Sequence, residues 1–458
     1  MPGQTSQKRA LPAVMIVGGG LGGLLMATLL ERADIPYHIY ERAGELRALG
    51  SIMTLGANVL PVFEQLGLLE EFERISKPVP SLDFYTSDIQ KLGSLDLKEF
   101  KAASGYSNYI FARPRLYEML RKQVPSHKVS LNKRVVRIEE THNKVTIFCE
   151  DESSYSGDIL IGADGAYSSV RQSIFKQMDE RGLLPASDSE NLSIGFISMV
   201  GVSHPKNPEK YPQLQDTLGH YSQVLGNDSR AWGVFSAADN QISWMLSSQL
   251  TAEEANEKRF SNAEWGPEAN QAMLNEFADM ACPWGGKMSD IFEDTPKHLI
   301  SKVFLEEKMF KTWYYGRTVL MGDACHKMFP GAGQGAVNAF QDAVVLANCL
   351  YVMEDKDPNT ITAAFQEYYR QRFDRANYQY NQSSYMSKTQ SGQTWANRAL
   401  RYAFLNYTPT VFQRTLYRWT CEYRPLVSWL PMIENRGTVP VLPQQGPTKL
   451  VVEKSVAL

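Results

Sequence analysis

The stretch AVMIVGGGLGGLLMATLLERADIPYHIYE, residues 13–41, decides the fold. It opens with the apolar run Ala13–Val17, which predicts a strand buried in a parallel sheet. A helical pattern of apolar residues runs from Leu24 to about Arg32, and the apolar run Tyr37–Tyr40 predicts a second strand. Strand, helix and strand in this order predict a βαβ unit.

Three glycines stand between the first strand and the helix. Gly18, Gly20 and Gly23 have the spacing G-x-G-x-x-G, in which the first makes the turn, the second lets the backbone approach a pyrophosphate and the third lets the helix pack on the strand. Glu41 closes the unit, where it can hold a pair of ribose hydroxyls. The unit therefore predicts a dinucleotide site. Because the fingerprint occurs once, we expect bound FAD and a nicotinamide cofactor that binds transiently.

Composition limits the other classes of function. The chain has 458 residues, enough for two or three domains, and its net charge of -3 gives no basic field for nucleic acid. The five cysteines form no C-x-x-C pair, and the seven histidines show no ligand spacing. We therefore expect a reducing, cytoplasmic location and neither a disulfide framework nor a metal site.

The apolar run from Ala10 to Leu30, which follows Lys8-Arg9, also resembles a signal sequence or a membrane anchor. Five glycines cluster within it, and each weakens a helix by about 1 kcal/mol relative to alanine. The dinucleotide interpretation accounts for this cluster better.

A second motif, TVLMGDACHKMFPGAGQGAVNAFQDAVVL, spans Thr318–Leu346. Its apolar start predicts a buried strand, Gly322-Asp323 a turn, and the small and apolar residues after Gly335 a helix. A glycine loop that ends at a helix N-terminus favours a negatively charged ligand, and Asp323 suits a ligand hydroxyl. The motif predicts a ligand cradle, and the alternative is a tight strand–helix connection.

The stretch Asp158–Gly165, DILIGADG, is another strand with an acidic end. Ile159–Ile161 predicts a short buried strand, and Ser168–Arg171 predicts the start of a helix behind it. Asp164 either lines the cofactor and receives the nicotinamide phosphates, or holds a packing turn through its own hydrogen bonds.

Residues 191–250 alternate in the manner of antiparallel strands. Trp232–Phe235 and Ile242–Leu246 flank Ala238-Asp239-Asn240 and predict a hairpin. Such a sheet buries one face in a core and can present the other to a pocket. We expect its aromatic side chains in the core rather than against a ligand.

The C-terminal part is basic and aromatic. A long helix is expected from Thr360 to about Tyr380, and residues 371–436 hold nine basic against three acidic side chains. Such a segment can make peripheral contact with an anionic intracellular membrane, or form a helix pair that packs on the core. We expect a disordered tail after Pro440.

Four motifs in chain order carry a resemblance to a known family. They are the glycine turn with Glu41, Arg113-x-x-Leu116, Gly162-Ala163-Asp164-Gly165, and Gly322-Asp323-Ala324-x-His326 through Pro330 to Asn338. The set resembles the class A FAD-dependent monooxygenases, the family of p-hydroxybenzoate hydroxylase. Within it, the chain is most similar to the fungal secondary-metabolite branch, which hydroxylates or epoxidises indole-diterpene (paxilline-like), meroterpenoid and alkaloid intermediates.

The resemblance implies an α/β fold. A Rossmann-like FAD-binding domain of the glutathione reductase type would be interleaved with an antiparallel-sheet substrate domain and followed by C-terminal helices. We expect the FAD-binding domain in three parts, 1–77, 108–180 and 301–380. The substrate domain would take 78–107 and 181–300, and a helical segment with a tail would take 381–458.

The resemblance also implies roles for single residues. Glu41 and Arg42 would contact the adenosine ribose, Arg113 the pyrophosphate and ribityl region, and Asp323 the ribityl hydroxyls, while Asp164 would serve both flavin and nicotinamide. The predicted cofactor-binding residues are Gly18, Gly20, Gly23, Glu41, Arg42, Gly50, Arg113, Asp164, Asp323, Pro330, Gly333, Gly335 and Ala336.

The implied activity is that of an NAD(P)H-dependent flavoprotein monooxygenase. The nicotinamide reduces FAD, O2 adds at flavin C4a, and the distal oxygen of the hydroperoxide passes to a double bond or ring carbon. The strand Ile194–Met199 lacks the basic residue typical of the fungal branch, which favours a largely apolar small-molecule substrate, and Tyr221 is the candidate catalytic or polar contact.

Two alternatives share this fold. A flavin-dependent halogenase would carry a W-x-W-x-I-P stretch, which the sequence lacks. The other alternative is a flavoprotein reductase that does not oxygenate its substrate.

Overall fold

The computed structural model describes residues 11–45, 52–226, 228–251, 253–254, 267–329, 333–391, 395–407, 415 and 418–444. Gly50 and Pro330, two of the predicted cofactor-binding residues, lie outside these ranges. Within them, no helix combines the length and the hydropathy needed to cross a bilayer.

A six-stranded sheet carries the first motif. Its order is β18-β19-β12-β1-β2-β8, and all neighbours are parallel except the edge strand β18 against β19. The apolar runs that predict buried strands form its centre, where side chains are covered on both faces. The strands are β18 (Tyr314–Tyr315), β19 (Thr318–Leu320), β12 (Ile159–Gly162), β1 (Val14–Val17), β2 (Tyr37–Tyr40) and β8 (Val129–Ser130).

An eight-stranded sheet forms the second layer, in the order β20-β17-β13-β16-β15-β14-β5-β6. Its pairs are antiparallel except β14 with β5. The strands are β20 (His326–Lys327), β17 (Ser301–Met309), β13 (Ser193–Ser203), β16 (Ile242–Gln249), β15 (Arg230–Ser236), β14 (Tyr221–Leu225), β5 (Ser81–Tyr85) and β6 (Lys91–Asp96). The predicted hairpin is confirmed as β15–β16.

The described residues also form two three-stranded sheets. One has the order β3-β7-β4, with β3 (Ile52–Leu55), β7 (Tyr109–Ala112) and β4 (Lys77–Pro78). The other has the order β11-β10-β9, with β9 (Val135–Glu140), β10 (Val145–Cys149) and β11 (Ser154–Gly157). Both of its pairs are antiparallel.

Helices cover the sheets and link them. In the six-stranded part, α1 packs against both α5 and α12, and α12 packs against α13. The helices are α1 (Leu21–Arg32), α2 (Leu60–Gln65), α3 (Leu69–Arg74), α4 (Glu99–Ser104), α5 (Arg113–Arg121), α6 (Ser169–Asp179), α7 (Ala186–Ser189), α8 (Pro212–Gln215), α10 (Pro267–Phe277), α11 (Met288–Glu293), α12 (Gly335–Tyr351), α13 (Pro358–Ser391) and α14 (Trp395–Tyr407). Four short 3-10 turns are η1 (Ser126–Lys128), η2 (Pro208–Lys210), η3 (Lys297–Leu299) and η4 (Gly322–Ala324).

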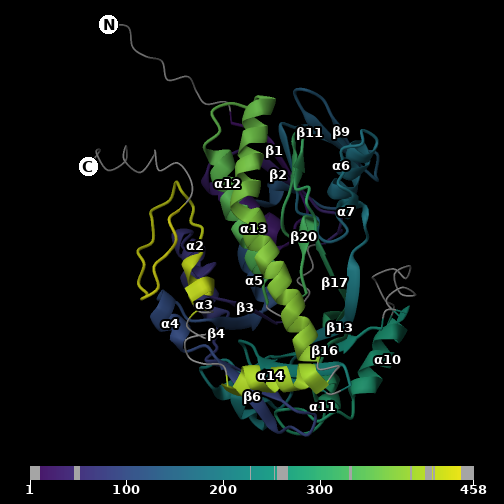
Figure 1. Cartoon of the computed structure of the whole chain (residues 1–458), viewed down its shortest axis with the longest axis vertical. Coiled ribbons are helices and arrows are strands. Elements are labelled where there is room, and N and C mark those ends of the chain that lie inside the picture. The colour runs from purple at the N-terminus through teal and green to yellow at the C-terminus, as the bar shows by residue number, and fades with distance from the viewer. Residues whose placement is uncertain are drawn as a thin grey trace.

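Figure 1 shows how the layers are joined. The strands β1 and β2 lie in the upper half of the view and β13, β16 and β6 in the lower half, with α13 running down the front past both. At the foot of α13, α14 turns across the molecule beside β6. The fold is the expected α/β arrangement of a Rossmann-like part, an antiparallel sheet and C-terminal helices.

The strand β17 (Ser301–Met309) pairs with β13 in the eight-stranded sheet, and the expected domain boundary at residue 301 stays a prediction. The end of the chain differs from the expectation. The predicted disorder after Pro440 does not begin there, because the Gln444 side chain donates to the carbonyl of Arg424 and accepts from the N–H of Leu426. The chain beyond Gln444 lies outside the described residues.

Candidate functional site

Three of the four predicted motifs meet at one edge of the six-stranded sheet. Val17, Tyr40, Gly162 and Leu320 are paired residues at the carboxyl ends of β1, β2, β12 and β19, which are adjacent parallel strands. The glycine turn follows β1 and its Glu41 follows β2, while the turns that carry Asp164 and Asp323 follow β12 and β19. Ligands of open α/β sheets bind outside the carboxyl ends of the strands, so the topology gathers the motifs into a single candidate site.

The glycine turn after β1 has the form that a dinucleotide requires. Gly18 has a φ of +110°, and a Cβ there would lie 2.4 Å from the carbonyl oxygen of Ala163. A Cβ at Gly23 would lie 2.1 Å from the carbonyl oxygen of Gly18, so α1 packs too closely on the turn for a side chain. By contrast, a Cβ at Gly20 would meet no atom of the described residues within 4 Å. The backbone at the start of α1 therefore faces open space in which a pyrophosphate fits.

Glu41 is fixed beside that turn. Its carboxylate accepts hydrogen bonds from the N–H of Gly19 at 2.6 Å and from the N–H of Ala43 at 2.9 Å. These bonds hold the side chain across the ends of β1 and β2, where a ribose would lie. Arg42, also predicted to contact the ribose, is exposed to solvent.

Asp323 stands in the turn η4 after β19, within a group of charges. Lys327 Nζ lies 2.5 Å from Asp323 Oδ2, and Asp323 raises the pKa of the lysine. Arg113 is the first residue of α5. Burial lowers the pKa of its guanidinium, and the charge of Asp323 opposes that shift. The structure thus brings together Asp323 and Arg113, which are far apart in sequence, and adds Lys327.

The surroundings of Asp164 agree with both predicted roles of its turn, as a cofactor contact and as a turn held by its own hydrogen bonds. Its Oδ2 accepts from the N–H of Val170 and the hydroxyl of Ser169, each at 3.2 Å, which holds the start of α6. Its Oδ1 is buried and has no hydrogen-bond partner in the described part of the chain. Burial raises the pKa of this carboxyl. The turn is braced internally and still leaves one acceptor for a ligand hydroxyl.

The buried Arg171 connects this turn to the next motif, although the sequence suggested only a helix start there. It donates to the carbonyl of Ala324 at 2.9 Å and to that of Ala166 at 2.7 Å. The turns after β12 and β19 are therefore held in a fixed relation.

The N-terminus of α12 forms the far side of the site. Gln334 precedes this helix, and its side chain does not cap the helix N-terminus. Gly333, one position earlier, has a φ of +64°. A Cβ at Gly335 would meet nothing within 4 Å among the described residues. Within the described ranges, no side chain caps the N–H groups of the first turn, which include that of Ala336, and such groups favour a negatively charged ligand.

These features fit a dinucleotide such as FAD. The open glycine turn suits a pyrophosphate, Glu41 and Asp323 are acceptors for hydroxyl groups, and the N-terminus of α12 suits the anionic end of a reduced flavin. Asp164 adds a buried acceptor that lacks a partner.

The eight-stranded sheet presents two different faces. One face carries Trp232, Trp244 and Leu246, which form a core with α10 and α11. These aromatic residues are in the core, as expected. Pairing places the following residues on the opposite face: Phe196, Ser198, Val200, Ser243, Met245, Ser247, Gln249, Gly233, Phe235, Tyr221 and Gln223. None of these carries a charge.

This uncharged face adjoins the motif after β19. The ring of Phe196 contacts that of Phe329, with centroids 5.4 Å apart, and Phe329 follows Lys327 by two positions. Tyr221 lies on the same face between Phe84 and Phe235, and its hydroxyl donates to Gln223 Oε1 at 2.7 Å. Burial raises the pKa of Tyr221. A catalytic role for Tyr221 stays a prediction.

Sequence reasoning missed a buried acid beside the site. Glu306 of β17 accepts a hydrogen bond from the hydroxyl of Tyr167 at 2.6 Å. Burial raises the pKa of Glu306, while the Tyr167 hydrogen bond and the charges of Lys327 and Arg171 oppose the rise. The sequence held a signal, since Glu306-Glu307-Lys308 is a run of charges inside an otherwise alternating strand, and all three are buried.

Cys325, His326 and Asp342 have the chemistry of metal ligands, and their ligand atoms lie within 4.8 Å of one another. The Asp342 carboxylate is already bonded to the Arg372 guanidinium at 2.8 Å and to His326 at 2.6 Å. A guanidinium in contact with the acid disfavours a second cation. This cluster is therefore better explained as a hydrogen-bond network than as a metal centre.

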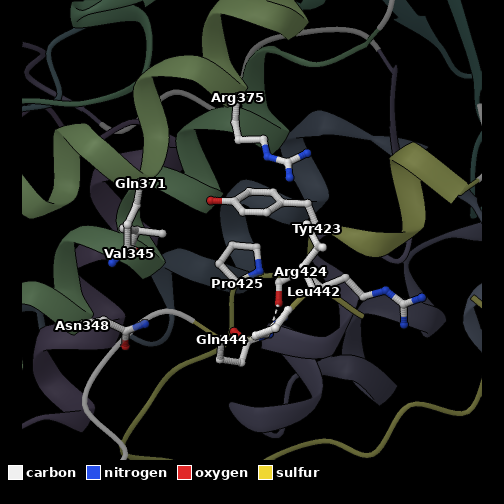
Figure 2. A pocket seen from close by; sticks show the side chains of 10 residues that line it. Val345, Asn348, Gln371, Arg375, Tyr423, Arg424, Pro425, Leu442 and Gln444 are labelled. Atoms are coloured by element: carbon white, nitrogen blue, oxygen red, sulfur yellow. Dashed lines mark hydrogen bonds between the residues drawn. The ribbon is translucent and has the colours of Figure 1, made fainter. Parts of the chain in front are cut away.

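A small pocket of ≈ 70 Å³ lies between α12, α13 and the C-terminal segment. Figure 2 shows Arg375 and Gln371 of α13, Val345 and Asn348 of α12, and Tyr423 around it. Ligand clefts usually hold about 300–1,000 Å³, and none of the four motifs lines this pocket. We regard it as a gap in the seam where the C-terminal segment packs on α12 and α13.

A family model described as "FAD binding domain" matches residues 12–376. Among curated relatives, the FAD-dependent monooxygenase ausM of Penicillium brasilianum is 28% identical over 449 residues, covering 94% of this chain and 90% of the relative. The FAD-dependent monooxygenase ptmM of Penicillium ochrochloron is 29% identical and covers 82% of this chain and 89% of the relative.

Solved structures share the fold. HpxO of Klebsiella pneumoniae, in complex with FAD and uric acid, superimposes with a TM-score of 0.73 at 20% identity, covering 92% of this chain and 98% of that one. A salicylate hydroxylase in a substrate complex gives a TM-score of 0.64 at 19% identity, with 90% and 98% covered.

Proposed function

The chain belongs to the FAD-binding-domain family as a class A flavoprotein monooxygenase, and on that premise we propose that it uses NAD(P)H and O2 to hydroxylate or epoxidise a largely apolar small molecule. The observation that carries the proposal is the meeting of the glycine turn, Glu41 and the turns of Asp164 and Asp323 at the carboxyl edge of β2, β1, β12 and β19. FAD is the cofactor of the family.

Bound FAD supplies the redox chemistry of such a reaction. In the overall balance, NAD(P)H, a proton and O2 are consumed, one oxygen atom enters the substrate, and the other leaves as water. The protein must therefore bind the cofactor in a fixed position, stabilise negative charge at its redox end, and exclude water.

Named residues fit these tasks. Glu41 would hold the adenosine ribose, and the open backbone at Gly20 would receive the pyrophosphate. Asp323, oriented by Lys327, would accept hydrogen bonds from the ribityl hydroxyls. The N-terminus of α12 would stabilise negative charge on the flavin ring. Asp164 Oδ1 remains as an acceptor for a hydroxyl of FAD or of the nicotinamide cofactor.

The uncharged face of the four central strands β13, β16, β15 and β14 supports an apolar substrate. A charged substrate would need a partner there, because a buried charge without one is costly. The side chains of Phe196, Val200, Met245 and Tyr221 instead offer apolar and aromatic contacts, and the serine and glutamine side chains offer neutral hydrogen bonds. A polycyclic or prenylated secondary metabolite has matching chemistry.

The reaction is tested with the FAD-loaded protein, NADPH or NADH, and apolar candidate substrates. We expect a substrate that increases both NAD(P)H oxidation and O2 uptake, and a product that gains one oxygen atom from 18O2 by mass spectrometry. NAD(P)H consumption coupled to substrate without an oxygenated product would contradict the proposal and favour the reductase. A halogenated product that requires chloride would favour the halogenase.

We also propose that α14 contacts the surface of an intracellular membrane. Its large apolar side chains are exposed, with Trp395 at 77% and Tyr407 at 70%. The chain has no acidic residue between Asp374 and Glu422, so anionic lipid would not be repelled there. An apolar substrate dissolved in lipid would then be close to the enzyme.

A further inference from the structure

A cluster of buried polar side chains lies behind the turn that carries Asp323. We call it the Asp342 network, and it consists of Asp342, Asn338 and Gln341 of α12, His326 of β20 and Arg372 of α13. Asp342, Asn338 and Arg372 are fully buried, and His326 is 1% exposed. Side chains from three elements therefore meet out of contact with water.

The hydrogen bonds of the network centre on the Asp342 carboxylate. Oδ2 accepts from the backbone N–H of Gly322 at 2.9 Å and lies 2.6 Å from Nε2 of His326. Oδ1 accepts from Nε of Arg372 at 2.8 Å. The guanidinium in turn donates to Asn338 Oδ1 at 2.8 Å and Gln341 Oε1 at 3.1 Å.

Such a network is not needed for packing alone. Buried ion pairs lose much of their attraction to desolvation, and apolar residues of similar volume often serve stability as well or better. A satisfied polar network instead fixes one geometry among its members. The question is which geometry the Asp342 network fixes.

Two residues that Asp342 contacts lie next to candidate flavin-binding residues in the sequence. Gly322 immediately precedes Asp323, and His326 immediately precedes Lys327. Gly322 has a φ of +60°, so the backbone leaves β19 in a sharp turn at the residue whose N–H Asp342 holds. Gly322 and His326 are both anchored to Asp342 of α12, so the short segment between them has little freedom. The Asp323–Lys327 pair is held on the outer side of this segment.

We propose that Asp342 is a positioning residue, which fixes the Asp323 carboxylate where the ribityl hydroxyls of FAD bind by anchoring Gly322 and His326. This inference rests on the ribityl role of Asp323 proposed above. It assigns a function to an acid on α12 that does not itself reach the cofactor.

A double-mutant cycle on FAD affinity tests the coupling. FAD is titrated into the deflavinated wild type, Asp323→Ala, Asp342→Asn and the double variant. We expect each single substitution to raise the Kd by about tenfold or more, the usual effect of losing a hydrogen bond to a charged group. The double variant should lie within about twofold of Asp323→Ala, because a misplaced carboxylate cannot matter once it is absent.

The outcomes distinguish the ribityl role of Asp323 from the positioning role of Asp342. An unchanged Kd for Asp323→Ala would reject the ribityl role, and the positioning role with it. If Asp323→Ala weakens binding and Asp342→Asn multiplies the Kd equally in both backgrounds, the ribityl role stands and the positioning role is rejected.

A second pair of variants covers the case in which Asp342→Asn does not fold. His326→Gln keeps a side-chain N–H for Asp342 and should retain FAD affinity within about twofold, whereas His326→Leu should lose about tenfold. Equal Kd values for the two would count against the proposal.

Arg317→Lys is the matched control, because Arg317 is another buried arginine, bonded to the carbonyls of His142 and Asp158 at the opposite end of β19. It should lower Tm and leave the Kd unchanged.

Discussion

Among single residues, the buried pair of Asp342 and Arg372 gives the protein a defined sensitivity to acid. Burial alone would raise the pKa of Asp342, but His326 and Arg372 lower it to about 2. A carboxyl whose pKa is lower in the folded state stabilises the fold above its ordinary pKa of 3.8, and this contribution is lost as the pH falls through 3.8 towards 2. We therefore expect Asp342→Asn to lower the free energy of unfolding by roughly 3 kcal/mol at pH 7. The deficit should shrink steadily between pH 4 and pH 2.

Urea unfolding of both proteins at several pH values measures this. Arg317→Lys, which removes no titrating group in that range, should show a deficit that does not change with pH. A constant deficit for Asp342→Asn from pH 7 to pH 2.5 would mean that the carboxylate is not stabilised by its buried partners.

The sequence predicts some residues of the site and misses others for a physical reason. Glu41, Asp164 and Asp323 could be recognised because each follows an apolar strand, and parallel strands end at the same edge of a sheet. Asp342 and Arg372 could not be paired, because their contact depends on how α12 packs on α13. The one sequence signal was a lone acid in a helix that contains no other charged residue.

At the scale of the element, the glycine motif that joins β1 to the first turn of α1 contains two glycines with opposite requirements. A Cβ at Gly23 would lie 2.1 Å from the Gly18 oxygen, so Gly23→Ala should lower the free energy of unfolding by about 1–3 kcal/mol. Gly20 has an extended backbone and open space around it, so Gly20→Ala should fold with near-normal stability. Because that space would receive the pyrophosphate, Gly20→Ala should weaken FAD binding by about tenfold or more.

Thermal unfolding of the deflavinated proteins and titration with FAD separate the two effects. Each variant serves as the control for the other. Normal FAD affinity in a well-folded Gly20→Ala protein would show that the pyrophosphate does not lie against this turn.

Element boundaries show where local patterns fail. The apolar runs at β1, β2 and β12 predict strands within about one residue, because burial on both faces leaves a continuous signal. The apolar pattern that begins at Val59 continues across two separate helices, α2 and α3. Gly67, in the left-handed region with a φ of +71°, lies between them and separates the two.

For the whole molecule, the division of the chain between the two large sheets is the least local property. The eight-stranded sheet is assembled from distant segments, including β5 beside β14 and β17 beside β13. Alternation along a strand predicts that it has two unlike faces, and it contains no information about which strand lies alongside. The domain boundaries therefore stay a prediction from the family resemblance, and the pairing of β17 bears on where one of them lies.

The exposed face of α14 leads to a prediction for the molecule as a whole. A surface patch of large apolar side chains usually marks an interface, and aromatic residues favour the headgroup region of a bilayer. We expect the protein to float with liposomes that contain anionic lipid. The exposed Trp395 and Tyr407 would each contribute on the order of 1 kcal/mol to binding. Replacing both with serine should therefore lower the partition coefficient by about tenfold or more.

Tyr385 on α13 supplies the matched control, since it is 59% exposed and lies outside α14. Tyr385→Ser should float like the wild type, and removal of residues 396–458 should reduce flotation at least as much as the double substitution. High salt should weaken binding if the arginines of this segment also attract anionic lipid. Equal flotation of the wild type and the Trp395→Ser, Tyr407→Ser protein would exclude α14 as the contact. Dimers that the same double substitution dissociates would instead identify the face as an interface between copies of the chain.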